Sequence, residues 1–430
     1  MAAVEKLSRG HQWIRRRPLT TMAIVLSTNS FKVEQYMKAC NTLLPWKPNN
    51  ELFDLAAKAS LPWHGHAKPR RFNPRGDPEK SVRFGKVMKS RIREIQTQYP
   101  GGTGWLVWDE PQRTVMPIAG EICRWLQKNF PETLVYTNGL PQGARRPSKY
   151  YGEEPPGGQY PYEQYVRDLI TIVQPDAVGF DIYPFKENGH TSNTFPTVAI
   201  TRKVALEAGI PYWAIVQSHQ DNKRGYRMPS ESDVRMQVFS LLTYGYTGIT
   251  YFTYDLAQGP AMISREGEAA PIYYDVARLN QEIVNIGQAL RFLTSTDVRV
   301  VPGNGNPLRR HTVAWTPGAG GEHRITAITI EDTEQADYKD LLVGFFNDDG
   351  GQPYVMVTNL WHGKNASASE RQLTIRLHFD GGVTHVGRLS RETGHPELLL
   401  IHDDQLQMTL SGGTGELLRL GDATFPGLNQ

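Results

Sequence analysis

The stretch Gly104-Trp-Leu-Val-Trp-Asp-Glu-Pro111 begins a regular alternation of apolar runs and helical patterns that decides the fold. Each apolar run is followed by a segment whose apolar residues have helical spacing, and this unit recurs five times. The expected strands are 104–111, 133–139, 176–185, 210–219 and 248–254, and the expected helices are 118–130, 162–173, 197–208, 232–244 and 274–292.

These runs are apolar throughout, which is typical of parallel strands covered by helices. A doubly wound nucleotide-binding sheet would place a glycine-rich phosphate loop after a strand, and neither G-x-G-x-x-G nor G-x-x-x-x-G-K-[ST] follows any of them. Polar and aromatic residues gather instead at the carboxyl ends of the runs, where barrels build active sites. We therefore predict an α/β fold, a (β/α)8 TIM-type barrel.

Three more β–α units must come from the first hundred residues. Candidate segments are a strand at 21–28, a helix at 51–60, a poorly defined strand at 60–67 and a helix at 82–98. These segments are short for three full units, so an irregular start and an incomplete barrel both stay open.

After residue 296 the pattern changes to short runs rich in Val, Ile, Leu and Thr, separated by glycine-rich turns. This texture predicts an antiparallel β-sandwich over 296–430. The barrel is expected over 21–292, and the arginine-rich residues 1–20 are expected to form a poorly ordered basic leader.

Composition excludes several classes of protein. The 430 residues carry a net charge of +3, which by itself gives no reason to expect a nucleic-acid partner, and the basic stretch 68–80 has no RNA-binding signature. No apolar run approaches the length of a membrane span. Two cysteines exclude a disulfide framework. No export signal is visible, so the location in the cell and the oligomeric state are not predicted.

The sharpest chemical feature is the pair Asp109-Glu110, where a buried strand emerges beside Trp108. Desolvation and a like charge both raise a carboxyl pKa, and a general acid must hold its proton near neutral pH. We predict that Glu110 is a general acid and that Asp109 assists it. A solvated loop in which Glu110 caps the next helix is the structural alternative.

A second carboxylate is expected at the same rim. Asp181 ends another strand and is the best placed, while Asp255 is the next candidate. Hydroxyl-binding amides and aromatic platforms around a polyol complete the expected site, although strand-end aromatics could equally fill the barrel mouth. The substrate-binding candidates are Trp108, Asn138, Tyr183, Gln217, His219, Tyr251, Tyr254 and Asp255.

Metal and cofactor chemistry is not expected. His64-Gly-His66 has metal-ligand spacing, but no nearby acid or cysteine completes a set. No nucleophile elbow of the form G-x-S-x-G is present. The sequence therefore predicts neither a metal nor a cofactor.

Residues 103–292 resemble the barrel of clan-A glycoside hydrolases, and the following β-domain resembles those such enzymes often carry. With 248–254 counted as the eighth strand, the motif Trp-Asp-Glu-Pro ends the fourth, and the resemblance gives Glu110 the role of acid/base. The clan's nucleophile is a glutamate at the end of the seventh strand, where this chain has Gln217. An amide cannot form the glycosyl ester, so the clan mechanism does not carry over intact.

Two arrangements could take the place of the missing glutamate nucleophile. Asp181 or Asp255 could be the second carboxylate, or Asp109-Glu110 could act like the similar pair of the substrate-assisted hexosaminidases, in which the substrate's 2-acetamido group attacks. The prediction is a glycoside hydrolase acting on an oligo- or polysaccharide. The rival hypothesis is a non-catalytic carbohydrate-binding barrel, which the glutamine at position 217 favours; a scaffold role is a third.

Overall fold

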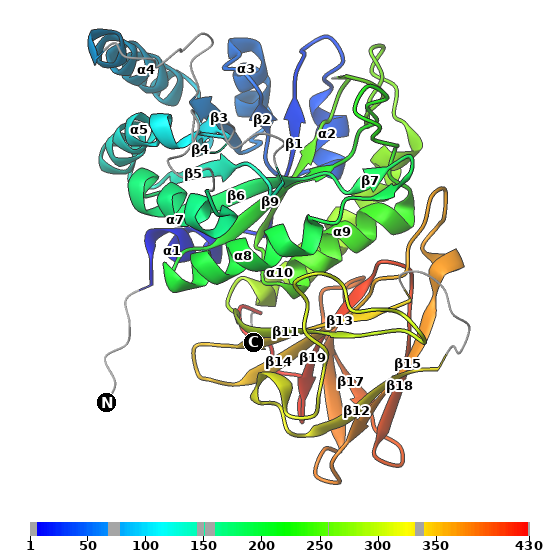
Figure 1. Cartoon of the computed structure of the whole chain (residues 1–430). Helices are drawn as coiled ribbons and strands as arrows, with labels where there is room; N and C mark the ends of the chain where they lie inside the picture. The colour runs from blue at the N-terminus through cyan, green and yellow to red at the C-terminus, as the bar shows by residue number, and fades with distance from the viewer. Residues whose placement is uncertain are drawn as a thin grey trace, which may run out of the picture. The chain divides into compact units, whose positions relative to one another are not determined.

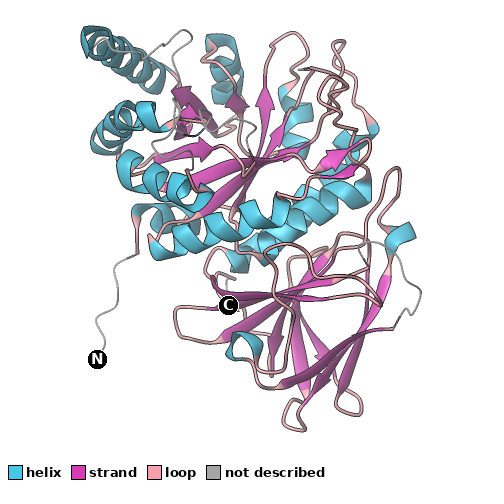
Figure 2. Cartoon of the chain, viewed as in Figure 1, coloured by secondary structure: helices cyan, strands magenta, loops and turns pink. Residues whose placement is uncertain are grey.

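The computed structural model describes residues 7–67, 78–143, 150, 160–256, 258–331 and 339–428, with the backbone alone over 78–84. Eight parallel strands alternate with helices, and antiparallel strands follow (Figures 1 and 2). The parallel strands are β1 (Thr20–Val25), β2 (Leu44–Pro45), β3 (Trp63–Ala67), β4 (Gly102–Asp109), β5 (Leu134–Gly139), β6 (Ala177–Ile182), β9 (Tyr212–Gln217) and β10 (Gly248–Phe252).

The parallel strands close into a barrel. Their order is β2-β1-β10-β9-β6-β5-β4-β3, and the two ends of this series meet where Leu43 pairs with Trp63 and accepts a hydrogen bond of 2.8 Å from His64 N–H. The (β/α)8 prediction is confirmed, and the barrel is complete. Strand β2 was missed because two residues are too few to show any periodicity.

The expected helices are present with small shifts at their ends. At the start of α9 (Glu231–Thr243) the Ser230 hydroxyl and the Asp233 carboxylate form a reciprocal capping box. Strands β7 (Phe185–Lys186) and β8 (Gly189–His190) form a small hairpin after β6. The helices are α1 (Arg9–Arg15), α2 (Val33–Ala39), α3 (Asn50–Lys58), α4 (Pro78–Gln98), α5 (Met116–Asn129), α7 (Tyr162–Val173), α8 (Thr194–Glu207), α9 (Glu231–Thr243) and α10 (Pro271–Leu290).

Helix α1 closes the amino-terminal end of the barrel. The Trp13 ring lies 5.8 Å from the ring of His64 and 6.0 Å from that of Trp213, measured between centroids, and belongs to the buried barrel cluster. The Arg9 guanidinium forms an ion pair of 3.0 Å with Asp176, just before β6. The expectation of a poorly ordered leader is therefore wrong for residues 7–20, because the apolar face of this short helix is buried; residues 1–6 lie outside the described part.

Glycine at position 10 permits this docking. A Cβ added there would lie 2.0 Å from the carbonyl oxygen of Asp176 and 2.7 Å from the Pro211 ring. The helix therefore approaches the barrel backbone more closely than any residue with a side chain would allow.

Contacts within the chain group it into two compact units. The first contains Met1–Tyr183, Ala199–Val216 and Gly248–Ala269, and the second contains Pro184–Val198, Gln217–Thr247 and Ala270–Gln430. Helices α9 and α10 thus belong to the same unit as the antiparallel sheets, although in the sequence they alternate with barrel strands.

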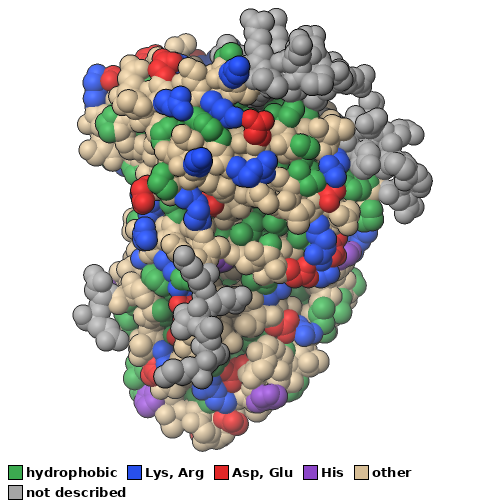
Figure 3. Space-filling view, turned by 90° about the vertical axis from the view of Figure 1, so that its left-hand side faces the viewer, with side chains coloured by type: hydrophobic (Ala, Val, Ile, Leu, Met, Phe, Trp, Pro, Cys, Tyr) green, Lys and Arg blue, Asp and Glu red, His purple; other side chains and the backbone are tan. Residues whose placement is uncertain are grey.

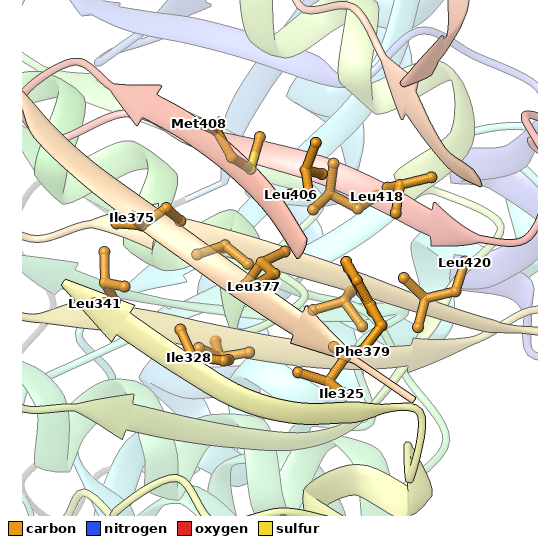
Figure 4. Packing of buried hydrophobic residues seen from close by; sticks show 14 of the residues in the cluster. Ile325, Ile328, Leu341, Ile375, Leu377, Phe379, Leu406, Met408, Leu418 and Leu420 are labelled. Carbon is orange, nitrogen blue, oxygen red and sulfur yellow. The ribbon is translucent and has the colours of Figure 1, made fainter. Parts of the chain in front are cut away.

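The antiparallel strands form a sandwich. A six-stranded sheet has the order β11-β13-β14-β19-β16-β17, and a three-stranded sheet has the order β12-β15-β18. Their facing side chains share one apolar core, in which Ile375 and Leu377 lie among residues of both sheets (Figure 4). The strands are β11 (Thr294–Val301), β12 (Ile325–Ile330), β13 (Leu341–Asn347), β14 (Pro353–Asn359), β15 (Leu373–Phe379), β16 (His385–Leu389), β17 (Pro396–Leu400), β18 (Gln405–Leu410) and β19 (Gly415–Leu420).

Helix α9 packs on β13 and β14. The hydroxyls of Thr243 and Thr358 lie 2.7 Å apart, and a Cβ at Gly344 would lie 2.2 Å from the Thr243 carbonyl oxygen. Six consecutive residues of each strand are buried, because the helix covers one face and the sandwich core the other.

Surface charge is mixed on the face shown in Figure 3, where basic and acidic side chains are interspersed. Most of the basic stretch 68–80 lies outside the described residues. None of the helices in the described part of the chain combines the length and apolar character that a membrane span requires.

We predict that Trp13→Ala destabilises the chain by about 3–5 kcal/mol, the usual loss for truncating a buried tryptophan. Urea denaturation followed by circular dichroism measures this change. Arg16→Ala is the control, because the Arg16 side chain is 68% exposed and should shift the midpoint little. Equal stability of the two variants would show that α1 does not hold the barrel closed.

Candidate active site

The end of strand β4 has an unusual backbone. Trp108 and Glu110 have φ angles of +58° and +51°, in the left-handed region that non-glycine residues rarely adopt, and the pairing with β5 shifts register between Leu106 and Asp109. Glu110 N–H donates to the Asn138 carbonyl oxygen over 2.8 Å. Strain of this kind, about 1–3 kcal/mol per residue, persists where surrounding contacts impose it and is common at active sites.

Asn138 joins two carboxylates. Its side-chain nitrogen donates to Asp109 Oδ1 at 2.9 Å and to Asp181 Oδ1 at 2.5 Å, so one amide links strands β4, β5 and β6. Gly179 lies opposite, where a Cβ would be 3.2 Å from the Asn138 Oδ1 atom. Asn138 is 1% exposed, so the two acids are oriented by a group that is itself held by packing.

Asp181 carries the clearest electrostatic perturbation. Burial raises its pKa well above the ordinary 3.8, and the negative charges of Glu110 and then Asp109 raise it further. Hydrogen bonds from Asn138 and from the Tyr183 hydroxyl, at 3.1 Å, oppose the rise. The three acids named by the sequence therefore share one electrostatic environment, and Asp181 is the one that tends to keep a proton.

Aromatic side chains stand at the same end of the barrel. Tyr183 and Phe252 have ring centroids 5.5 Å apart, and Trp46 and His66 have centroids 4.6 Å apart. Trp46, Tyr183 and Phe252 are partly exposed and pack against the barrel core. The Tyr183 hydroxyl donates to Asp181 at 3.1 Å, so the Tyr183 and Phe252 rings offer apolar surface beside that carboxyl group.

Sequence reasoning missed Trp46, His66 and Phe252. Trp46 follows the two-residue strand that went unrecognised, and His66, which lies in β3, was considered only as a metal ligand. The signal for Phe252 was present: neighbouring strand residues face opposite sides, so Phe252 and Tyr251 cannot both face the barrel mouth.

Tyr251, Tyr254 and Asp255 lie inside the protein. Both tyrosines are 0% exposed, and the Tyr254 ring packs 5.0 Å from that of Tyr36. The Asp255 carboxylate accepts hydrogen bonds of 2.8 Å from the backbone N–H groups of Leu26 and Ser27, and burial raises its pKa. These residues hold the wall of the barrel and the segment after β1.

Gln217 is fully buried and binds backbone groups. Its oxygen accepts from Phe185 N–H at 2.9 Å, and its nitrogen donates to the Arg227 carbonyl oxygen at 2.8 Å. His219 is also buried, with its ring 5.8 Å from that of Tyr226. The amide at the end of β9 therefore fixes the local backbone. Trp108 is 6% exposed, and its carbonyl accepts from the Thr137 hydroxyl.

Within the ranges that the structure describes, no group with metal-ligand geometry contains His64 or His66. His64 lies in the barrel interior with its ring stacked 6.1 Å from Trp213, and burial lowers its pKa to about 3. Among the described residues, the group with metal-ligand geometry is His190, Asp233 and His362, all in the second unit.

No protein-family model matches this chain, and no curated protein sequence matches it significantly. Solved structures that resemble its fold include glycoside hydrolases. A β-galactosidase from the psychrophilic Marinomonas ef1 has 10% identity, covering 63% of this chain and 60% of that chain, with a TM-score of 0.46. An α-L-arabinofuranosidase from Thermotoga maritima has 9% identity, covering 95% and 88%, with a TM-score of 0.44.

A xylanase from Thermobacillus composti has 11% identity, covering 62% of this chain and 98% of that chain, with a TM-score of 0.40. At TM-scores below 0.5 these likenesses carry no argument about the reaction. The chemistry of this site has to be argued from its own residues.

We predict that Asp181→Asn stabilises the chain above pH 7 by about 0.5–2 kcal/mol, as is common when a strained functional group is relieved. Because the folded state raises the pKa of Asp181, it binds that proton more tightly than the unfolded state does. The parent chain therefore loses stability as pH rises from the unfolded to the folded pKa of Asp181, and Asp181→Asn avoids this loss.

The measurement is urea denaturation of both proteins across pH 4 to 8. The gain should shrink toward pH 4, because the pH then approaches the ordinary value of 3.8 and the unfolded chain also begins to bind the proton. Asp54→Asn is the control, because the Asp54 side chain is 49% exposed and should give no pH-dependent difference. A variant less stable than the parent at pH 8 would contradict the assignment.

Proposed function

We propose that this chain hydrolyses a glycosidic bond at the carboxyl end of its barrel. The observation that carries the proposal is the linked set Asp109–Asn138–Asp181 beside Glu110, in which one buried amide orients acids from neighbouring strands. Paired carboxyl groups are what glycoside hydrolysis requires, one to protonate the leaving oxygen and one to stabilise or trap the positive sugar. Partly exposed aromatic rings next to these acids suit a sugar ring.

Glu110 is the proton donor in this proposal. Its side chain is partly buried at the strained end of β4, and its backbone N–H is held by the Asn138 carbonyl oxygen. Its negative charge raises the pKa of Asp181 more than the charge of Asp109 does. Close carboxyl groups cannot all ionise together, so a proton is retained in the cluster near neutral pH. In this proposal the proton rests on Asp181 in the free protein and on Glu110 in the reacting complex, where Glu110 passes it to the leaving oxygen as the bond from that oxygen to the anomeric carbon breaks.

Asp109 is the anion that we assign to the second role. Asp181 tends to hold a proton and accepts from Asn138 and Tyr183, while Asp255 is occupied by backbone N–H groups. Gln217, at the end of β9, cannot form a glycosyl ester. Asp109, the direct neighbour of Glu110, is therefore the carboxylate that opposes the positive charge on the reacting sugar.

This arrangement supports the substrate-assisted route. The oxygen of a 2-acetamido group attacks the anomeric carbon, and Asp109 orients the amide N–H and stabilises the positive charge that it acquires. A water molecule then opens the cyclic intermediate, giving its proton to Glu110 and its oxygen to the anomeric carbon. The substrate class is accordingly a glycoside of an N-acetylated sugar.

A sugar-binding barrel without catalysis is the second candidate. The absence of a carboxylate at the end of β9 favours it, because that is where the clan resembled by the sequence has its nucleophile. Calorimetry with oligosaccharides separates the two functions, since this candidate binds without turnover.

We predict that Glu110→Gln lowers kcat by about 10²–10⁴, the usual contribution of general acid catalysis. The measurement uses a panel of aryl glycosides that includes 2-acetamido sugars, with folding checked by circular dichroism. Glu121→Gln is a matched control, because Glu121 is an exposed glutamate on α5 that pairs with Lys89. Unchanged turnover in Glu110→Gln removes this residue from the mechanism.

We predict that aryl 2-acetamido-2-deoxyglycosides are cleaved at least about 100-fold faster than the matching 2-hydroxy glycosides. Without the acetamido group the attacking oxygen is lost, and with it the large advantage of an intramolecular reaction. Comparison of kcat/KM for each pair of substrates measures this ratio. Equal rates would exclude the substrate-assisted route while leaving glycoside hydrolysis in place.

A further inference from the structure

Three side chains in the second unit converge without any role in the proposed reaction. His190 comes from β8, Asp233 from the first turn of α9 and His362 from the loop after β14. One ligand atom of each lies within 4.8 Å of the other two. His362 and Asp233 are buried, and His190 is partly exposed.

The tautomer of His362 directs a lone pair into this cluster. Its Nδ1 atom lies 2.8 Å from the Leu360 carbonyl oxygen, which can only accept, so Nδ1 carries the hydrogen and Nε2 carries the lone pair. A ring nitrogen that donates to a carbonyl while the other faces the cluster is the usual arrangement of a metal-binding histidine.

The distances are close to those of a metal site. His362 Nε2 lies 2.9 Å from His190 Nε2 and 4.0 Å from Asp233 Oδ1. Ligands about 2.0–2.1 Å from a tetrahedral ion are separated by roughly 3.3 Å. All three ligand atoms already lie within 4.8 Å of one another, so small side-chain movements would bring them to that spacing.

Space for a fourth ligand is present beside the histidines. A cavity of about 240 Å³ is lined by both rings and by residues of the α8 start and the sandwich, among them Thr191, Phe195, Arg309 and Arg310. Catalytic and exchangeable metal sites keep such an open position. The arginines would favour an anion there.

Positive charge near the cluster limits its affinity for a cation. Arg227 forms an ion pair with Asp233, and Arg309 forms one of 2.6 Å with Asp340. Each arginine is thus matched by a carboxylate, and one lone pair of Asp233 Oδ1 must be shared with the ion. A divalent ion carries one more positive charge than Asp233 can balance, and an anionic fourth ligand would offset it.

We propose that His190 Nε2, His362 Nε2 and Asp233 Oδ1 bind a divalent transition-metal ion of the zinc class, whose fourth position opens into this cavity. The site is independent of the glycosidase proposal, since it uses none of the residues at the barrel mouth. Without an ion, a His190 N–H donates a hydrogen bond to His362. The test must distinguish this hydrogen-bonded pair from a pair that binds a metal ion.

The test is titration of the EDTA-stripped full chain with Zn²⁺ at pH 7.5, by calorimetry in a buffer that does not bind metals. We expect one ion per chain and a rise in the melting temperature on saturation. Because His362 is fully buried and its replacement could prevent folding, the variant is His190→Ala, for which we expect at least tenfold weaker binding.

His402→Ala is the matched control, because His402 is an exposed histidine of the same unit and should leave the affinity unchanged. Co²⁺ gives a second readout, since a four-coordinate N/O site produces strong visible absorption that His190→Ala should abolish. Equal zinc affinity of the parent chain and His190→Ala, or no ion bound by the parent chain, would overturn the proposal and leave a hydrogen-bonded histidine pair.

Discussion

The side-chain amide of Asn138 donates both of its hydrogens to carboxylates, one on the strand before it and one on the strand after it. Two anions brought together by folding repel each other, and an amide nitrogen is a neutral donor that can hold both without cancelling their charge. A lysine or arginine there would neutralise the pair and lower both pKa values. An asparagine adds no positive charge to the cluster, so burial and the neighbouring acids still raise the pKa of Asp181 well above its ordinary value.

This arrangement depends on a barrel that is closed and rigid. Closure rests on a short contact between the segments around Leu43 and Trp63, and the amino-terminal end of the barrel is filled by the tryptophan of α1. Packing at the amino-terminal end keeps the strands in register, so their carboxyl ends present the acids at fixed separations. Stability and chemistry are thus placed at opposite ends of the same strands, as is usual in this architecture.

The second unit follows a different principle. Its helices and sheets bury ionic groups in pairs, such as Arg235 with Glu282 at 2.5 Å and Arg391 with Glu416 at 3.1 Å. Against this background of matched charges, the two histidines beside Asp233 stand out, because the Asp233 carboxylate is already paired with Arg227. They lie beside a cavity, which leaves space for a ligand.

The sequence by itself determined the barrel, the sandwich and the identity of the acids at the strand ends. Continuous apolar runs, helical spacing and glycine-rich turns are local signals, and the carboxyl ends of parallel strands meet on one side whatever the details. It could not show the two-residue strand β2, the ordered helix α1 or the rings of Trp46 and Phe252, because each depends on partners far away in the chain.

Only the tertiary structure decided which candidates face the site. Tyr251 and Phe252 are neighbours of similar chemistry, and the direction of the strand sends one into the interior and leaves the other partly exposed. Asp255 and Asp181 are both strand-end acids, yet one is held by backbone N–H groups and the other by Asn138. The three residues of the His190 cluster are separated by more than forty positions at each step, so no local pattern could bring them together.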